Sequence, residues 1–285
     1  SFPTRRSPGP DLVQLVTRGR CDLLAAMEWG AIREADSAWL PGVPGKTSGS
    51  RWGALYALTP CRLLADDHPL IEGSLAKFET PLSEGGLPVD TGWLAGGLWV
   101  AIALDNFAEA HLARDEGDAV ASLFYATLNH ATPLVTWCEE RSPEPGATTC
   151  TGDRQHLWTP VAVVRCLRNL MIREDLQARG LHIAQGMPRH WLGNGTRIGA
   201  EKATTHFGPV NYSLQYDEAT GTVEGTLEAR WREAPDWVDF HLRLPEGLRI
   251  TLVEPDASLE LLSPERLRWS PEADKLHFSA KVGVS

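Results

Sequence analysis

The segment Asn129–Trp158 reads NHATPLVTWCEERSPEPGATTCTGDRQHLW and lies between two stretches with helical periodicity. A loop of this length between helices is usually either functional or disordered. Disordered segments are poor in aromatic residues, whereas this one holds two tryptophans and two cysteines, so we predict that it is ordered. Its carboxylates, guanidinium groups and indoles together suit a polar, ring-shaped ligand such as a sugar. The alternative is a structural loop whose charges pair with one another.

Two adjacent carboxylates in this segment are the candidates for a catalytic base. Glu139 or Glu140 could activate a water molecule in glycoside hydrolysis, and a neighbouring arginine would keep that carboxylate ionised. Because the two residues are adjacent, their side chains point in different directions, and we expect one to be the base and the other a structural partner of Arg141. The predicted substrate-binding residues of the segment are His130, Trp137, Arg141, Asp153, Arg154, His156 and Trp158.

Several of these residues have a structural alternative that the sequence leaves open. Asp153 could cap the helix that follows it. His156 could be packed in the core, and His130 could cap the end of the preceding helix. Outside the segment, we predict that Asp90, Trp93 and Trp99 also contact a sugar. For these the alternative is a turn residue and core indoles.

The composition argues against several classes of partner. The chain has 285 residues, a formal net charge of -10 and a pI of about 5.4, so we expect neither nucleic acid nor an anionic membrane as a partner. No apolar run reaches the length of a membrane helix, and SFPTRRSPGP at the start shows no signal peptide, which favours a cytoplasmic location. The first residue is not methionine, so a fragment or a processed form remains an alternative.

No motif for a metal or a cofactor is present. The five cysteines form no CxxC pair, the histidines are scattered, and neither a phosphate-binding loop nor a serine-hydrolase elbow occurs. We therefore expect no metal and no cofactor. Cys138 and Cys150 bracket the central loop and could close it as a disulfide, although reduced thiols are the rule in a cytosolic protein.

Hydrophobic periodicity divides the chain into a helical part and a β part. Helical spacing predicts helices over 11–27, 51–64, 69–79, 93–114, 119–129 and 155–175, joined by alternately long and short loops. From His206 the pattern alternates, with a turn at Thr220-Gly221. We therefore predict a domain of helical hairpins over 1–180, a connector over 181–205, and a small antiparallel β-sandwich domain over 206–285.

The order TWCEERSPEPGATTCTGDRQHLWTPVAVVRCL resembles the end of the catalytic domain in glucoamylase-like and other (α/α)6-toroid glycosidases. The segments TTHFGPVNYSLQY and WVDFHLRLPEGLRI resemble the C-terminal β-sandwich of α-L-rhamnosidase-type enzymes. The resemblance implies inverting hydrolysis of a glycoside or oligosaccharide by a water nucleophile. Glu139 or Glu140 would then be the general base, PEPG the turn after it, and Trp158 the start of the last barrel helix.

The sequence departs from that family in one respect. A complete toroid has twelve helices, whereas about six are predicted here. The resemblance therefore implies a partial toroid, completed by a missing N-terminal half or by a second copy in a homodimer. Two alternatives are a toroid polysaccharide lyase, which the low tyrosine content and the acidic charge disfavour, and a non-catalytic carbohydrate-binding or scaffold fragment.

Overall fold

The structure is a computed structural model in which contacts divide the chain into two compact units. Unit 1 comprises residues 1–114 and 129–159, and unit 2 comprises residues 115–128 and 160–285. The predicted domain boundaries stay a prediction. The residues that the structure describes are 10–47, 51–79, 82–83, 85–90, 94, 96–131, 136–142, 150–253 and 258–284.

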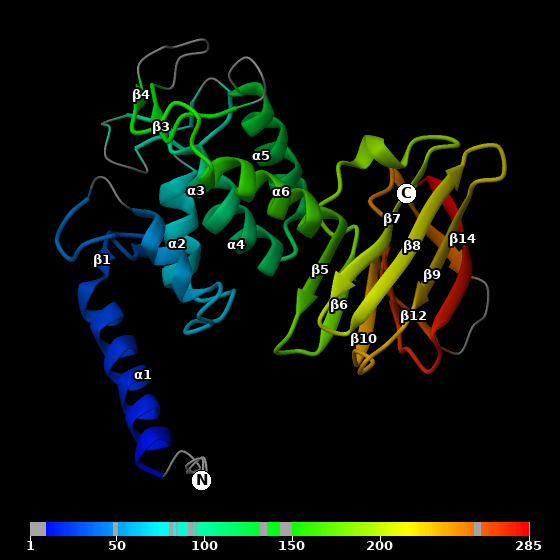
Figure 1. Cartoon of the computed structure of the whole chain (residues 1–285), viewed down its shortest axis with the longest axis horizontal. Coiled ribbons are helices and arrows are strands. Elements are labelled where there is room, and N and C mark those ends of the chain that lie inside the picture. The colour runs from blue at the N-terminus through cyan, green and yellow to red at the C-terminus, as the bar shows by residue number, and fades with distance from the viewer. Residues whose placement is uncertain are drawn as a thin grey trace, which may run out of the picture. The chain divides into compact units, whose positions relative to one another are not determined.

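Unit 1 contains most of the helices (Figure 1). Helix α2 begins where His68 accepts a hydrogen bond from the Leu70 N–H group and Pro69 occupies the first turn, where its missing N–H group costs nothing. The elements of this unit are α1 (Pro10–Gly30), β1 (Ile32–Arg33), β2 (Ala38–Trp39), the 3₁₀ helix η1 (Arg51–Ala57), α2 (Pro69–Phe78), and a continuous helix made of α3 (Val100–Ile102), the π-helical turn η2 (Ala103–Phe107) and α4 (Ala108–Ala113).

The core of unit 1 lies between α2, η1 and the α3–α4 helix. Leu55, Ile71 and Leu104 are fully buried, and the rings of Phe78 and Phe107 lie 5.7 Å apart. Burial of such side chains contributes about 1.5–3 kcal/mol each. This core supports the start of the α3–α4 helix, where Trp99 precedes the first turn and Asp105 lies in the π-helical turn.

Unit 2 is built on two five-stranded sheets. Sheet 1 has the order β12-β13-β10-β6-β5, and β6 pairs with β10 in parallel; sheet 2 has the order β11-β14-β9-β8-β7. The elements are α5 (Gly117–Asn129), α6 (Trp158–Met171), β5 (Ile172–Asp175), β6 (Gly180–Ile183), the 3₁₀ helix η3 (Arg189–Leu192), β7 (Arg197–Thr205), β8 (Gly208–Asp217), β9 (Thr222–Ala229), β10 (Trp237–His241), β11 (Leu248–Val253), β12 (Leu259–Ser263), β13 (Arg266–Trp269) and β14 (Lys275–Val284).

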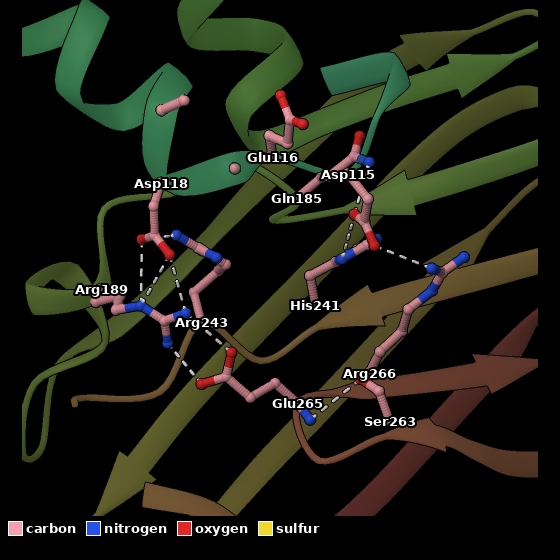
Figure 2. Close-up of a pocket in the computed structure, with 12 residues that line it drawn as sticks. Asp115, Glu116, Asp118, Gln185, Arg189, His241, Arg243, Ser263, Glu265 and Arg266 are labelled. Atoms are coloured by element: carbon pink, nitrogen blue, oxygen red, sulfur yellow. Dashed lines mark hydrogen bonds and ion pairs between the residues drawn. The ribbon is translucent and has the colours of Figure 1, made fainter. Parts of the chain in front are cut away.

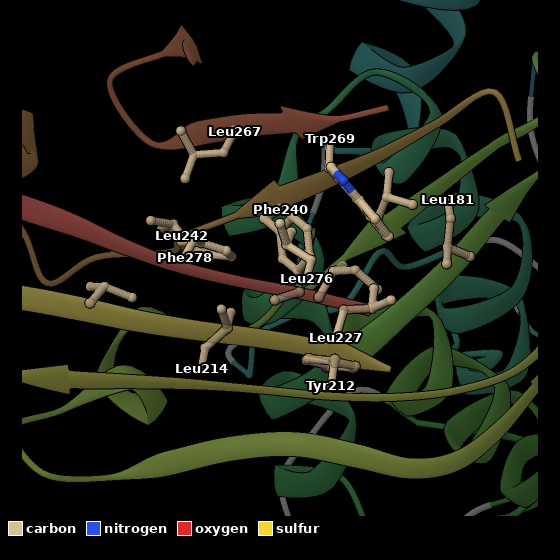
Figure 3. Close-up of a cluster of buried hydrophobic side chains, with 14 of the residues drawn as sticks. Leu181, Tyr212, Leu214, Leu227, Phe240, Leu242, Leu267, Trp269, Leu276 and Phe278 are labelled. Carbon is tan, nitrogen blue, oxygen red and sulfur yellow. The ribbon is translucent and has the colours of Figure 1, made fainter. Parts of the chain in front are cut away.

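The two sheets pack face to face around one apolar core (Figure 3). Sheet 1 contributes residues such as Phe240 and Trp269, and sheet 2 contributes residues such as Leu227 and Phe278. The ring centroids of Phe240 and Phe278 lie 5.1 Å apart in an edge-to-face arrangement, with an angle of 68° between the ring planes. Because side chains alternate along a strand, the residues between these core positions lie on the opposite face of each sheet.

The outer face of sheet 1 is charged, yet largely buried. On β10, Val238 and Phe240 are on the core side, so Asp239 and His241 lie on the outer side with exposed fractions of 0% and 6%. The register places His182 of β6 and Arg268 of β13 directly beside Asp239. A row of polar side chains therefore crosses the middle of this sheet.

The predicted toroid is wrong. The chain is 33% helical and 31% strand, and its described residues contain no ring of helical hairpins. The segment predicted as a helix over 51–64 forms only the short 3₁₀ helix η1. The helix predicted over 155–175 ends at Met171, because Ile172–Asp175 pairs with β6 as the edge strand β5. The resemblance to toroid glycosidases is contradicted by the same observations.

The other sequence predictions of helices and strands agree better with the structure. The segments predicted as helices over 11–27, 69–79 and 119–129 form α1, α2 and α5. The turn predicted at Thr220-Gly221 joins β8 to β9. The connector predicted over 181–205 stays a prediction as a domain boundary; this stretch contains most of β6, which lies between β10 and β5 in sheet 1, and the whole of β7. In the part of the chain that the structure describes, no helix is both long and apolar enough to cross a bilayer.

A half-buried carboxylate, that of Glu174, ties α6 to the edge of the β-sandwich. Glu174 Oε2 accepts a hydrogen bond from Arg168 Nη2 at 2.8 Å, and its Oε1 accepts one from the His206 N–H group at 2.6 Å. Burial raises the pKa of Glu174, but these contacts outweigh burial, so the net shift is downward from 4.5. Because the pKa of Glu174 is lower in the folded than in the unfolded state, the ionised carboxylate stabilises the folded state at pH values above the unfolded pKa. This stabilisation is lost as the pH falls through the folded pKa.

We expect Glu174→Gln to lower the free energy of unfolding of unit 2 at pH 7 by about 1–3 kcal/mol, the usual range for a hydrogen bond to a charged group. Urea denaturation from pH 7 to 3 would measure this, and the difference from the unsubstituted protein should shrink as the pH falls below 4.5. The control is Glu228→Gln, which removes an exposed ion pair with Lys275 and should cost less than about 1 kcal/mol. Equal costs for the two variants would contradict the prediction.

Candidate functional site

The central segment forms a short antiparallel hairpin in unit 1. Strand β3 (Glu140–Arg141) pairs with β4 (Cys150–Thr151), and further backbone hydrogen bonds join Glu139 to Asp153 and Trp137 to His156. Arg141 also exchanges both backbone hydrogen bonds with Leu98, just before the α3–α4 helix. The hairpin is therefore held between Leu98 and the residues that lead into α6. The predicted PEPG turn lies outside the described residues.

Glu140 and Arg141 have structural contacts. Glu140 is completely buried, and its Oε1 accepts a hydrogen bond from the Leu94 N–H group at 2.9 Å. Arg141 is buried and donates to the carbonyl oxygens of Ser142 and His130. Both side chains therefore hold neighbouring loops in place.

Glu139 differs from Glu140 in its surroundings. Adjacent residues of a strand point to opposite faces, so Glu139 lies on the other face of the hairpin, where it is half-buried. Its carboxylate lies against Gly152, which has a φ of +66° and no side chain to occupy that space. Among the described residues, no hydrogen bond or ion pair of the Glu139 carboxylate occurs. The structure thus distinguishes two carboxylates that the sequence could not.

An aromatic cluster borders the hairpin at the start of α6. The rings of Trp99 and Trp158 lie 5.4 Å apart at 83°, and His156 lies 6.0 Å from Trp158. Trp158 is half-buried and donates from Nε1 to Asp105 Oδ2 at 3.2 Å, which brings in a carboxylate from the π-helical turn. Sequence reasoning did not single out Asp105, because an acidic residue inside a helical pattern gives no signal of its own.

The remaining predicted residues lie in different environments. Trp99, Trp137 and His130 are buried, with 3–4% of each exposed. Asp90 is half-buried in a turn with a φ of +57°, and its N–H group donates to the Gly97 carbonyl oxygen. The residues left on the surface of the hairpin are Asp153 and Arg154. Trp93 lies outside the described residues.

Cys138 and Cys150 are free thiols in hydrogen-bond contact. Cys138 is buried and Cys150 is half-buried. Burial raises the pKa of Cys138, and its contact with Cys150 raises it further.

A second group of polar residues, in unit 2, was missed by the sequence analysis. A cavity of about 310 Å³ opens beside the first turn of α5, and its walls include four carboxylates and three guanidinium groups (Figure 2). Asp118 contacts Arg189 and Arg243, and Arg189 also donates to both oxygens of Glu265. The alternation of WVDFHLR, with Asp239, His241 and Arg243 at every second position, was the available signal.

The electrostatics of this cavity follow from burial and from close charge pairs. Burial raises the pKa of Asp118, but Arg189 and Arg243 outweigh it and lower the pKa overall. Burial lowers the pKa of His241 to about 4, against the opposing effect of Asp115. The pKa of His182 falls well below 6.5, first through burial and then through His241. Both imidazoles are therefore neutral at physiological pH.

Comparison of the sequence with models of protein families and with curated protein sequences finds no match. The function is therefore argued from the geometry of these two groups of residues.

The fit of Glu139 over Gly152 can be tested by adding one methyl group. A Cβ atom at position 152 would overlap the Glu139 side chain, and the left-handed backbone would add strain. Gly96 has the same φ of +66°, but nothing lies within 4 Å of the position of an added Cβ atom. Gly96→Ala is therefore a control that introduces backbone strain alone, which should lower the free energy of unfolding by about 1–2 kcal/mol. We expect Gly152→Ala to cost about 1 kcal/mol or more beyond that control, as overpacking does.

The measurement is the free energy of unfolding in urea for both variants. Glu139→Ala combined with Gly152→Ala should recover most of the excess cost, because the overlapping carboxylate is then absent. If Gly152→Ala and Gly96→Ala cost the same, the Glu139 side chain does not occupy this position.

Proposed function

We propose that unit 1 binds a carbohydrate at the β3–β4 hairpin and hydrolyses a glycosidic bond, with Glu139 as the general base. The observation that carries the proposal is the difference between the two adjacent glutamates. Glu140 is completely buried and bound to the Leu94 N–H group, whereas Glu139 is half-buried and makes no hydrogen bond or ion pair among the described residues. A carboxylate in that condition can accept a proton from water.

The neighbours of Glu139 supply groups suited to a sugar. Asp153 and Arg154 are exposed on the paired segment and can exchange hydrogen bonds with hydroxyl groups. Half-buried Trp158 has an indole whose face suits the C–H side of a sugar ring. The proposed ligand is therefore a neutral glycoside or oligosaccharide, in keeping with the net charge of -10.

In the proposed reaction, Glu139 takes a proton from a water molecule as the water oxygen attacks the anomeric carbon. The bond to the leaving oxygen breaks, and a second carboxylic acid gives that oxygen a proton. In an inverting enzyme the two carboxyl groups stand about 6.5–9.5 Å apart, which leaves space for the water. Asp153 is a candidate for the acid, since it lies opposite Glu139, whose N–H group donates to the Asp153 carbonyl oxygen.

The test is hydrolysis of a panel of aryl glycosides and oligosaccharides, together with calorimetric measurement of binding. We expect Glu139→Gln to lower kcat by about 10²–10⁴-fold with little change in binding, since a general base acts on the proton transfer. The control Asp36→Asn changes an exposed carboxylate elsewhere in unit 1 and should leave kcat unchanged. If Asp153 is the general acid, Asp153→Asn should remove the fall in kcat at high pH that deprotonation of this acid causes.

Two results would contradict the proposal in different ways. Binding of an oligosaccharide without hydrolysis, unaffected by Glu139→Gln, would support a carbohydrate-binding module instead. Neither binding nor hydrolysis across the panel, with the protein folded, would overturn the carbohydrate assignment itself.

A further inference from the structure

The outer face of sheet 1 brings two histidines and an aspartate together from different strands. The parallel register of β6 and β10 places His182 beside Asp239, and His241 follows two residues later on the same face. Donor atoms of the three side chains all lie within 4.8 Å of one another, and all three side chains are buried. Two imidazoles and a carboxylate are ligands that divalent transition metals accept.

The spacing of the imidazole nitrogens suits a shared ion. His182 Nδ1 and His241 Nε2 are 3.1 Å apart. Two nitrogens bound to one ion at about 2.0–2.1 Å stand about 2.8–3.0 Å apart in octahedral geometry and about 3.3–3.4 Å apart in tetrahedral geometry, so the observed distance lies between the two. A hydrogen bond between two neutral imidazoles has a similar length, so the spacing alone does not choose between a metal and a proton.

The groups around the histidines favour the metal. His241 Nδ1 faces Asp115 Oδ1 at 3.4 Å, and Asp115 is itself held by Gln185 and Arg266 (Figure 2). A carboxylate that accepts the second N–H group of a histidine orients the other nitrogen toward a metal and raises its basicity. The position of Asp115 favours the His241 tautomer with its proton on Nδ1, and that tautomer leaves Nε2 as the acceptor that faces His182.

Asp239 retains room for an ion although two arginines hold it. Its Oδ2 atom accepts hydrogen bonds from both Arg266 and Arg268, whereas within the described part of the chain its Oδ1 atom accepts only the one from Arg268 Nε at 2.7 Å. A carboxylate oxygen offers two lone pairs, so Oδ1 keeps one. The guanidinium groups of Arg173, Arg266 and Arg268 oppose a cation, and the carboxylates of Asp115 and Asp239 offset them only in part, which predicts moderate affinity.

We propose that His182, His241 and Asp239 bind one divalent ion of the zinc class. Imidazole ligands select Zn²⁺, Co²⁺ or Ni²⁺ over Mg²⁺ and Ca²⁺, which prefer oxygen. His241 also lines the cavity of about 310 Å³, so an ion and its water ligands have a route from solvent. Three protein ligands leave a coordination position for water or for a small ligand, as in catalytic rather than structural zinc sites.

The test uses the full chain after dialysis against a chelator, with Zn²⁺, Co²⁺ or Ni²⁺ alone as the probe. We expect one ion per chain by calorimetry and by elemental analysis, and a visible absorption spectrum for Co²⁺ that reports nitrogen ligands. Mg²⁺ should not compete. The melting temperature should rise with the concentration of Zn²⁺, because the ion binds only the folded form.

Substitutions separate this site from adventitious surface binding. His182→Gln should abolish the Co²⁺ spectrum, and Asp115→Asn, at a position with a 44% exposed side chain, should weaken Zn²⁺ binding by about 10–100-fold without unfolding the protein. The controls His206→Gln and His277→Gln remove exposed histidines that face glutamates, and they should leave Zn²⁺ binding and the Co²⁺ spectrum unchanged.

Either of two results would overturn the proposal. One is the absence of stoichiometric binding of any of the three ions at micromolar concentration. The other is binding that the control substitutions remove and that Asp115→Asn leaves intact, which would assign the ion to the surface.

Discussion

Asp239 is a fully buried carboxylate at the centre of sheet 1, and the rest of the β-sandwich is arranged around the need to neutralise it. Removing such an ion from water costs several kcal/mol unless charged donors replace the water. Arg266 and Arg268 are those donors, and both come from the neighbouring strand β13. A shift of the β10–β13 pairing by one residue would turn the arginines into the apolar core and bring Leu267 to the charged face. The ion pairs and the core therefore specify the same register.

Local patterns in the sequence predicted local structure. Helical spacing located α1, α2 and α5, and alternation located the hairpin of β8 and β9, because each of these depends on contacts between near neighbours in the chain. The toroid failed because it required a particular arrangement of several helices in space. Residues 172–175 show the reason: they were predicted as the end of a helix, but they pair with β6, and β6 in turn pairs in parallel with β10, more than fifty residues later.

The candidate site was predictable in its position more than in its details. The composition of residues 129–158 predicted an ordered loop, without its pairing as β3 and β4, and adjacency alone implied that Glu139 and Glu140 point apart. Which of them is buried depends on the register with β4 and on the contact with Leu94, neither of which leaves a trace in the sequence. The row of polar residues in unit 2 was hidden for a similar reason, since His182 and Asp239 become neighbours only through a parallel pairing.

The chain passes between the two units three times, after Arg114, Leu128 and Thr159, so unit 2 is discontinuous in sequence. Residues 115–128 belong to unit 2 and carry Asp115 and Asp118 at the start of α5. These two carboxylates contact Arg266 and Arg189, which lie more than sixty residues further along the chain. A gene fragment that encodes only residues 160–285 would keep Arg189, Arg243 and Arg266 and lose Asp115 and Asp118. In its charge balance this β-sandwich is therefore not a self-contained C-terminal module, because residues 115–128, which lie between two parts of unit 1 in the sequence, supply its acidic partners.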